Sequence, residues 1–368
     1  MREALRLAGQ RFLFGFDGLE VSPDCRTLIR DFGAGNVILF GRNVDAPEQV
    51  AELVRELQSV ARDAGHELPL LVGVDQEGGR VARLGKPWTR WPPLRALGRA
   101  DSEDLARRVG EALAAELGAC GIRWDFAPVV DVDTNPDNPV IGDRSFGPDP
   151  ERVATLGAAL VRGLQSSGVA ACAKHFPGHG DTALDSHLEL PVVEHPRSRL
   201  DEVELRPFRA AVEAGVASVM TGHLLLPELD AERPATLSRA LLGGVLRDEL
   251  GFLGLVVSDD LEMKAVAARW PAGERALLAA EAGCDVLASC ASPEDQVAGI
   301  EALVRGLESG RVPWKACEDA AARVRAAKER YLLPYADPKP ALARAAAGGE
   351  ARWALAEEIA ARSGVMPA

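Results

Sequence analysis

The sequence lacks the paired cysteines of a disulfide-stabilised protein. Its six cysteines are scattered along 368 residues, and none of them forms a CxxC motif. A disulfide framework is typical of a much shorter secreted chain. We therefore expect reduced thiols, as in a cytosolic protein.

An excess of positive charge and long apolar runs are also missing. The formal net charge is −13, and because nucleic-acid-binding surfaces are usually basic, we expect no nucleic-acid partner. The N-terminal stretch MREALRLAGQRFLFGF contains no long apolar segment ending in a small-residue cleavage site. Charges interrupt every apolar run before it reaches membrane-spanning length. The sequence predicts a cytoplasmic protein with no membrane partner, and it leaves the oligomeric state open.

The sequence does contain the alternating pattern of a globular α/β protein. Hydrophobic residues make up 47% and charged residues 26%, which is ordinary for such proteins. Nearly continuous apolar runs are typical of parallel strands buried on both faces, and they occupy 11–16, 36–40, 70–75, 122–129, 169–176, 218–223, 254–260 and 285–289. Helical patterns, often preceded by Asp or Ser and closed by Gly, occupy 47–65, 102–121, 150–168, 199–215, 274–283 and 293–310.

Eight strand–helix alternations predict a (β/α)₈ barrel of the TIM type over residues 1–333. A doubly wound open sheet is the alternative. Residues 334–368 are Ala-rich with Pro and Gly breaks, and they predict a partly helical C-terminal tail. In a barrel, polar residues at the strand C-termini converge on the face that carries the active site. Those residues are Asp75, Asp131, Lys174, His175, His223 and Asp259.

The segment KHFPGHGDTALDSHLELP, residues 174–191, concentrates three of the six histidines. One interpretation is a zinc site made by these histidines and an aspartate. However, the prolines and glycines of FPGHG prevent the helix on which a His-x₃-His pair shares one face. The second interpretation is acid/base chemistry, because Asp185 can orient and stabilise the ring of His187. Asp185 as a turn former beside a solvated His187 is the structural alternative.

Three further motifs carry candidate site residues. In GLVVSDDLEM, an apolar strand ends in Asp259 and Asp260, and because burying unpaired charge is costly, one interpretation is a nucleophile with a structural neighbour. Both acids as helix caps or surface residues is the alternative. In VDQEGGRVARL, Asp75 ends a strand before a Gly-Gly turn. In IGDRSFG, Arg144 is a candidate anion or hydroxyl clamp, and a surface pair with Asp143 is equally compatible with the sequence.

Together the motifs VDQEGGRV, DFAPVVDV with IGDRSFG, AKHFPGHGDTALDSH and GLVVSDDLEM resemble those of the family 3 glycoside hydrolases. The resemblance covers about residues 10 to 330, and the KHFPGHG…DSH signature is that of the cytoplasmic β-N-acetylhexosaminidase branch of bacterial cell-wall recycling. It implies a barrel hydrolase that releases terminal β-linked N-acetylglucosamine with retention, without a cofactor or a metal. The implied partner is a carbohydrate, such as a muropeptide or another N-acetylglucosamine glycoside.

The resemblance also implies residue roles. Asp259 matches the nucleophile, His187 the acid/base and Asp185 its partner, while the matching sugar-binding positions are Asp75, Arg83, Arg144, Lys174 and His175. His179 has no implied catalytic role, and we expect it to hold the loop's shape or a nearby substrate group. Glu262 stands where the family often has a small residue, and the tail from about residue 334 lies outside the resemblance. A histidine replaces one of the two carboxylates that retaining glycosidases usually employ.

Other functions stay compatible with these motifs. A β-glucosidase or a phosphorylase would use the same fold, since a His acid/base tolerates an anionic phosphate acceptor better than a carboxylate does. A metal-dependent barrel hydrolase would be sensitive to chelators. A non-catalytic sugar-binding barrel should lack Asp259 or His187, and this sequence has both.

Overall fold

The barrel predicted from the sequence is confirmed. In the computed structural model, which describes residues 2–183 and 189–365, eight parallel strands form one sheet in the order β10-β1-β2-β3-β6-β7-β8-β9. A parallel bridge between Val257 and Val286 joins the two ends of the sheet, so the open-sheet alternative is wrong. The strands are β1 (Phe12–Phe14), β2 (Asn36–Leu39), β3 (Leu71–Val74), β6 (Trp124–Asp125), β7 (Ala170–Phe176), β8 (Ser218–Thr221), β9 (Leu255–Val257) and β10 (Leu287–Ser289).

Successive side chains of each strand enter two different cores. Leu13 packs inside the barrel, in a cluster that also contains Trp124 and Phe126, whereas Phe12 and Phe14 pack outward against the helices. The period of two along a strand explains this division. Because both faces are buried, each large apolar side chain contributes about 1.5–3 kcal/mol of transfer free energy.

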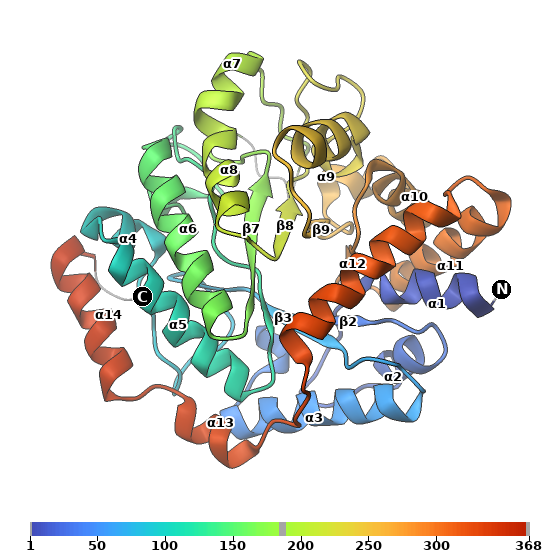
Figure 1. The fold of residues 1–368 in the computed structure, drawn as a ribbon, viewed down its shortest axis with the longest axis horizontal. Coiled ribbons are helices and arrows are strands. Elements are labelled where there is room, and N and C mark those ends of the chain that lie inside the picture. Colours follow the sequence, from blue (N-terminus) through green and yellow to red (C-terminus); the bar gives the residue numbers. More distant parts are fainter. Residues whose placement is uncertain (1, 184–188, 366–368) are drawn as a thin grey trace.

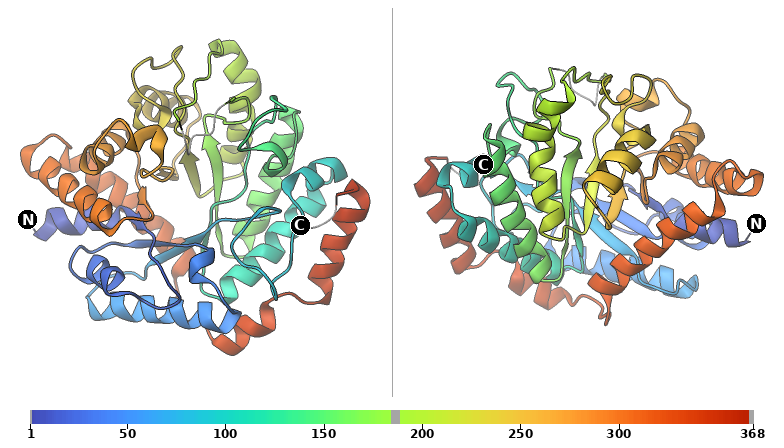
Figure 2. Two further views of the ribbon diagram at one scale, coloured as in Figure 1. Left: turned by 180° about the vertical axis from the view of Figure 1, so that it is seen from behind. Right: turned by 45° about the horizontal axis from the view of Figure 1, so that its top comes forward.

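Helices surround the strands (Figures 1 and 2). The predicted helices correspond to α3 (Pro47–Asp63), α5 (Glu103–Ala119), α6 (Pro150–Ser166), α8 (Leu205–Glu213), α10 (Ala272–Ala282) and α11 (Pro293–Ser309). Ser102, Asp149 and Ser292 cap α5, α6 and α11 through their side chains, as their sequence positions indicate. Helices α5 and α6 approach closely at Gly163, where a Cβ atom would lie 2.1 Å from the carbonyl oxygen of Arg107.

Several elements were not predicted. They are α1 (Arg2–Gln10), α2 (Pro23–Arg30), α4 (Leu94–Ala100), the hairpin of β4 (Gln76–Gly78) and β5 (Val81–Ala82), α9 (Lys264–Ala267) and α12 (Trp314–Leu332), with an irregular helical segment at Ala240–Glu249. The irregular helical turn at Leu200–Glu204 lies within the helix predicted at 199–215. Helix α12 covers the end of the barrel where the strands begin, and its Val324 and Tyr331 belong to the inner core. No helix among residues 2–183 and 189–365 is long and apolar enough to cross a membrane.

The C-terminal tail forms α13 (Pro340–Ala346) and α14 (Glu350–Ser363), which lie against α3, α5 and α4 (Figure 1). A buried carboxylate on α5 holds the turn between them. One oxygen of Glu116 accepts hydrogen bonds from the Gly348 amide at 2.7 Å, the Thr89 amide at 3.0 Å and the Thr89 hydroxyl at 2.9 Å. The tail is therefore fastened to the loop that follows the β4–β5 hairpin. The predicted boundary at residue 333 stays a prediction.

Candidate active site

A cavity of about 450 Å³ opens where the barrel strands end. Asp259 and all five predicted sugar-binding residues line it. Of the six strand-end residues that the sequence singled out, Asp131 and His223 do not line the cavity but contact residues that do. The remaining lining residues include Phe40, Glu77, Arg80, His179, Asp260, Met263 and Cys290.

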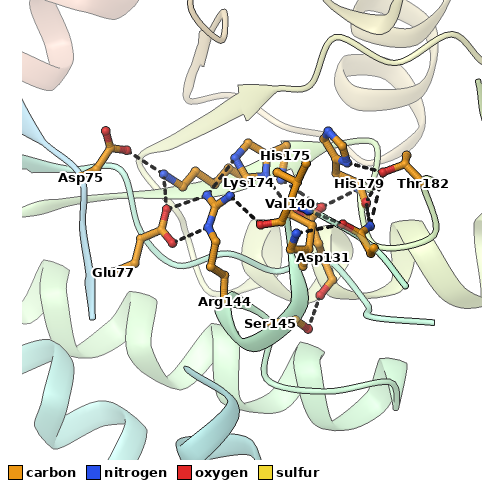
Figure 3. A network of polar contacts seen from close by, with 12 residues as sticks. Asp75, Glu77, Asp131, Val140, Arg144, Ser145, Lys174, His175, His179 and Thr182 are labelled. Carbon is orange, nitrogen blue, oxygen red and sulfur yellow. Dashed lines mark hydrogen bonds and ion pairs between the residues drawn. The ribbon is translucent and has the colours of Figure 1, made fainter. Parts of the chain in front are cut away.

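Glu77 is the centre of the charged network on one side of this cavity (Figure 3). Its carboxylate accepts two hydrogen bonds from Arg144, at 2.8 and 2.9 Å, and forms an ion pair with Lys174 Nζ at 2.7 Å. Lys174 Nζ also bonds Asp75 Oδ1 at 2.7 Å. Burial alone would raise the pKa of Glu77, but Arg144 and Lys174 outweigh it and hold that pKa well below its usual range. Two cations and two carboxylates thus neutralise one another beside the cavity.

The same carboxylates keep Lys174 charged. Burial of this side chain would lower the pKa of its ammonium, and Asp75 and Glu77 raise that pKa above its usual value. Arg83 adds a weaker contact of 3.6 Å to the other oxygen of Asp75. Since the cationic groups are held by carboxylates rather than left bare, this side of the cavity offers hydrogen-bond donors in fixed positions.

Asp131 fixes the second side of the site. Its Oδ2 accepts from His175 Nδ1 at 2.7 Å, and its Oδ1 accepts from the backbone amides of His175 at 3.1 Å and His179 at 2.7 Å. The pKa of Asp131, which burial would raise, is held low by His175 and by these hydrogen bonds. Because Nδ1 donates to the carboxylate, His175 Nε2 is left as an acceptor, 3.4 Å from Arg144 Nη2. Asp131 therefore sets both the tautomer and the orientation of His175.

Asp259 directly follows the strand-end residue Ser258 and reaches the cavity. Its backbone amide bonds Thr221 Oγ1 at 3.4 Å, and its Oδ1 accepts from the Asp260 amide at 2.8 Å. Burial would raise the pKa of Asp259, but His223 and His175 outweigh it and hold that pKa below its ordinary value. The carboxylate is consequently ionised at neutral pH, which is the form that a nucleophile requires.

The neighbouring acids have different environments. Burial raises the pKa of Asp260 to about 7, and its Oδ1 accepts from the Glu262 amide at 3.1 Å. Glu262, which stands where the family often has a small residue, is half-buried and does not line the cavity. Its carboxylate accepts from Ser289 Oγ at 2.7 Å, the Ala291 amide at 3.0 Å and the Ser292 amide at 2.9 Å. Glu262 thereby holds the loop that follows β10.

The arginines of the predicted motifs separate into two kinds. Arg144 faces the cavity and pairs with Glu77, whereas Asp143 pairs with Arg80 at 3.0 Å, so the Asp143–Arg144 surface pair is wrong. Arg80 also donates to the carbonyl oxygens of Val140 and Ile141, which fastens the hairpin to this loop. The hairpin turn itself requires Gly78 and Gly79, whose φ values are +96° and +57°.

The predicted acid/base residues Asp185 and His187 lie outside the described residues. On the described part of the same segment, His179 Nδ1 lies 2.7 Å from Thr182 Oγ1, and burial, together with the nearby His175, lowers the pKa of His179 to about 4. This agrees with the expectation that His179 holds the shape of the segment. Nearby, Asp181 contacts His195 and accepts from Thr134 Oγ1 at 2.8 Å.

The sequence analysis did not predict the structural roles of two residues at the site, Glu77 and Glu262. Glu77 is two residues from Asp75 in VDQEGG, and the period of two along an extended segment could have placed both on one face. Nothing local indicates that Glu262 contacts a loop 27 residues further along the chain.

Comparison with known proteins identifies the family. The model of the glycosyl hydrolase family 3 N-terminal domain matches residues 10–327. The chain belongs to glycosyl hydrolase family 3. It is therefore a glycosidase built on a barrel whose strand ends carry the charged cavity described above.

Relatives and solved structures of the family resemble the chain along most of its length. A protein named beta-hexosaminidase from Thiobacillus denitrificans is 44% identical over 283 residues, which are 75% of this chain and 77% of the relative. A family 3 beta-N-acetylglucosaminidase from Paenibacillus sp. has a TM-score of 0.90 at 42% identity, over 97% of this chain and 68% of that one. NagZ from Neisseria gonorrhoeae in complex with N-trifluoroacetyl-D-glucosamine has a TM-score of 0.77 at 33% identity, over 96% and 98%. Another structure of the Neisseria protein is a complex with a zinc ion.

Proposed function

We propose that this glycosidase is a retaining β-N-acetylhexosaminidase that releases terminal, non-reducing β-linked N-acetylglucosamine. The observation that carries the proposal is the position of the ionised Asp259 carboxylate in a cavity lined by the candidate sugar-binding residues. A further support is that relatives at 38–44% identity bear the name beta-hexosaminidase. In this proposal Asp259 attacks the anomeric carbon and forms a covalent glycosyl-enzyme.

The proposed proton transfers belong to His187. It protonates the departing glycosidic oxygen, and then deprotonates the water that hydrolyses the glycosyl-enzyme, while Asp185 orients its ring. The hydroxyl groups of the sugar bond Asp75, Lys174, Arg144, His175 and Arg83. Because the charges of these groups are already balanced by Glu77 and Asp131, the cavity suits a neutral sugar.

The proposed natural substrate is N-acetylglucosaminyl-anhydro-N-acetylmuramic acid from peptidoglycan, with or without its peptide. This would place the enzyme in cell-wall recycling in the cytoplasm. The support for it is the resemblance of the motif KHFPGHG…DSH to that branch and the likeness to the Neisseria protein. A β-glucosidase or a phosphorylase on the same fold is the alternative.

The test is hydrolysis of an aryl β-N-acetylglucosaminide beside the matching β-glucoside, each with and without a strong chelator and with and without phosphate. We expect chelator-resistant cleavage of the N-acetyl substrate alone, with the β-anomer of N-acetylglucosamine appearing first by ¹H NMR. Formation of N-acetylglucosamine 1-phosphate would indicate a phosphorylase. Loss of activity with chelator would contradict the mechanism.

A variant separates the roles of the two catalytic groups. His187→Ala should retain most activity on an aryl glycoside with a very acidic leaving group and lose it on an alkyl glycoside, since only the second requires protonation. Equal losses on the two substrates would exclude His187 as the acid.

A further inference from the structure

A second cavity, of about 820 Å³, lies at the opposite end of the barrel. Its lining includes Gln10, Gly33 and Leu68, which come shortly before β1, β2 and β3, whereas the candidate active site lies where these strands end. Helices α1 and α12 form its walls. Its size is within the range of small-molecule sites, which are about 300–1,000 Å³.

The charge of this cavity differs from that of the chain as a whole. Five basic and three acidic side chains line it, in a protein whose net charge is −13: Arg2, Arg6, Arg30, Arg325 and Lys328 against Asp31, Glu67 and Glu318. Arg325 is paired with Glu67 at 2.6 Å. Arg6 and Arg30 are exposed, and neither forms an ion pair within 4.0 Å of a described carboxylate, while Arg325 and then Arg6 hold the pKa of Glu67 below its usual value. Positive charge is thus available at the cavity opening.

Lys328 carries the buried amine of this cavity. It projects from α12, is 1% exposed, and donates to Gln10 Oε1 at 2.9 Å. Within the described part of the chain no carboxylate forms an ion pair with it, and burial lowers the pKa of its amine to about 7. When protonated, the ammonium group has three protons to donate, and among the described residues only Gln10 Oε1 accepts one of them.

Gln10 and His66, which lie beside Lys328, form hydrogen bonds with other groups. Gln10 Nε2 donates to the Gly33 carbonyl at 3.0 Å and lies 3.4 Å from His66 Nδ1. His66 Nε2 lies 2.9 Å from the Ile29 carbonyl oxygen. Since that carbonyl can only accept, His66 carries its proton on Nε2, and Nδ1 accepts from Gln10. The amide of Gln10 is therefore oriented with its oxygen toward Lys328.

An anion would complete this arrangement. We propose that the cavity binds a small organic anion, a carboxylate or phosphate group on an apolar body, with Lys328 as the buried anchor and Arg6 and Arg30 at the opening. The apolar part would contact Leu5, Leu7, Ile29 and Val324, which line the same cavity. Charge-assisted hydrogen bonds to a buried ammonium are the strong kind, and a cation lacking a counter-ion in its own protein obtains one from the ligand.

Binding is also coupled to protons. A bound anion stabilises the charged form of Lys328, so binding above about pH 7 must take up a proton. The other titratable groups around the cavity are His66, Glu67, Glu318 and Asp31. The pKa of His66 is lowered by burial below its usual 6.5, so proton uptake between pH 7 and 9 would come from Lys328.

The experiment is isothermal titration calorimetry with benzoate, phenyl phosphate, inorganic phosphate and phenol as probes. Saturating N-acetylglucosamine occupies the candidate active site throughout. We expect saturable binding of benzoate or phenyl phosphate that is tighter than binding of inorganic phosphate, and none of phenol. Titrations at pH 8 in buffers of different ionisation enthalpy should give an uptake of close to one proton per bound anion.

Variants assign the binding to this cavity. Lys328→Met should weaken binding about ten-fold or more and abolish the proton uptake. Arg6→Ala and Arg30→Ala, at exposed positions that do not affect folding, should each weaken it about three-fold. Arg305→Ala, an exposed arginine on α11, is the matched control and should change nothing. Equal binding of phenol, or anion binding unchanged in Arg6→Ala, Arg30→Ala and Lys328→Met, would overturn the proposal; if Lys328→Met does not fold, the two arginine variants and the proton uptake decide.

Discussion

Two lysines buried at opposite ends of one barrel differ in charge state. Lys174 is 2% exposed and lies between Asp75 and Glu77, which raise the pKa of its amine above the usual value. Lys328 is 1% exposed, its one hydrogen bond within the described residues is to an amide oxygen, and burial lowers its pKa to about 7. Burial is the same in both places, so the partners decide whether a buried amine is charged.

The difference also explains what each end can bind. Where the strands end, four charges cancel in pairs, and the cavity presents fixed donors and acceptors to a neutral ligand. Where the strands begin, the buried amine of Lys328 lacks an ion-pair partner within the described residues, and the exposed Arg6 and Arg30 line the same cavity. The first arrangement is complete in the free protein, and the second becomes complete with an anion.

The largest effect should come from the carboxylate at the catalytic end. Asp259→Asn removes the proposed nucleophile and should lower kcat by at least about 10⁴-fold, with the thermal melt unchanged in form. Asp31→Asn is the matched change at the opposite end, at an exposed residue that lines the second cavity. It should leave steady-state activity unchanged. Comparable kcat values in the two variants would mean that the nucleophile lies elsewhere.

The second effect compares the lysines directly. Lys174→Met leaves two carboxylates short of a cation and should reduce the free energy of unfolding by about 3 kcal/mol, because breaking a buried ion pair strands the remaining charge. Lys328→Met removes an amine that has no ion-pair partner among the described residues and whose pKa burial lowers to about 7, so the free energy of unfolding should not fall at pH 8. Urea denaturation of both variants at that pH measures the difference. Equal losses would refute the claim that partners, rather than burial, distinguish the two sites.

The third effect is the pH dependence of that comparison. Lys has a pKa near 10.4 in an unfolded chain and about 7 at position 328 in the folded one. Below pH 7 the amine is protonated in both states. Between pH 7 and 10 the unfolded chain binds more protons, so wild-type protein should gain stability relative to Lys328→Met by up to about 1.4 kcal/mol per pH unit.

Lys174 should behave in the opposite way. Its folded pKa is raised, so its contribution is present at all pH values below the unfolded pKa and is lost only as the pH rises beyond the folded one. The stability difference between wild type and Lys174→Met should therefore be constant from pH 6 to 9.

The pH series of both lysine variants require zwitterionic buffers, because carboxylate or phosphate buffers could occupy the second cavity. If the stability difference between wild type and Lys328→Met does not change from pH 7 to 10, the lowered pKa of Lys328 is wrong.

The smallest effect should come from Glu262, whose carboxylate accepts hydrogen bonds from backbone amides and does not pair with a cation. Glu262→Gln replaces one of the two carboxylate oxygens by an NH₂ group, which cannot accept the backbone N–H that this oxygen binds. The change should loosen the loop after β10, whose Cys290 lines the active-site cavity. We expect KM to rise about three-fold with kcat changed less than two-fold. Glu294→Gln, in the same segment and exposed, is the control. A fall in kcat alone would assign Glu262 a different role.

The sequence predicted what local patterns determine. The strands were recognised because residues such as Val37–Leu39 are buried on both faces, and Asp75, Lys174 and Asp259 were located because strand ends converge in a barrel. The environment of Lys328 could not be predicted, since a lysine within a helical pattern is ordinarily solvated. It becomes buried when α1, more than 300 residues earlier, covers it. The same holds for Glu116, an acid of an amphipathic helix whose donors come from two distant segments.

The hydrogen bonds from Thr89 and Gly348 to Glu116 constrain the order in which parts of the chain can fold during synthesis. The bond from Gly348 to Glu116 spans 232 residues, and at synthesis rates of about 5–20 residues per second this partner emerges roughly 12–46 s after Glu116 itself. Until then α3, α4 and α5 have no tail to cover them, and Glu116 can bind the loop bearing Thr89 but not the tail. The bond that ties the C-terminal tail to Glu116, and through it to the loop bearing Thr89, can therefore form only after α13 has been synthesised.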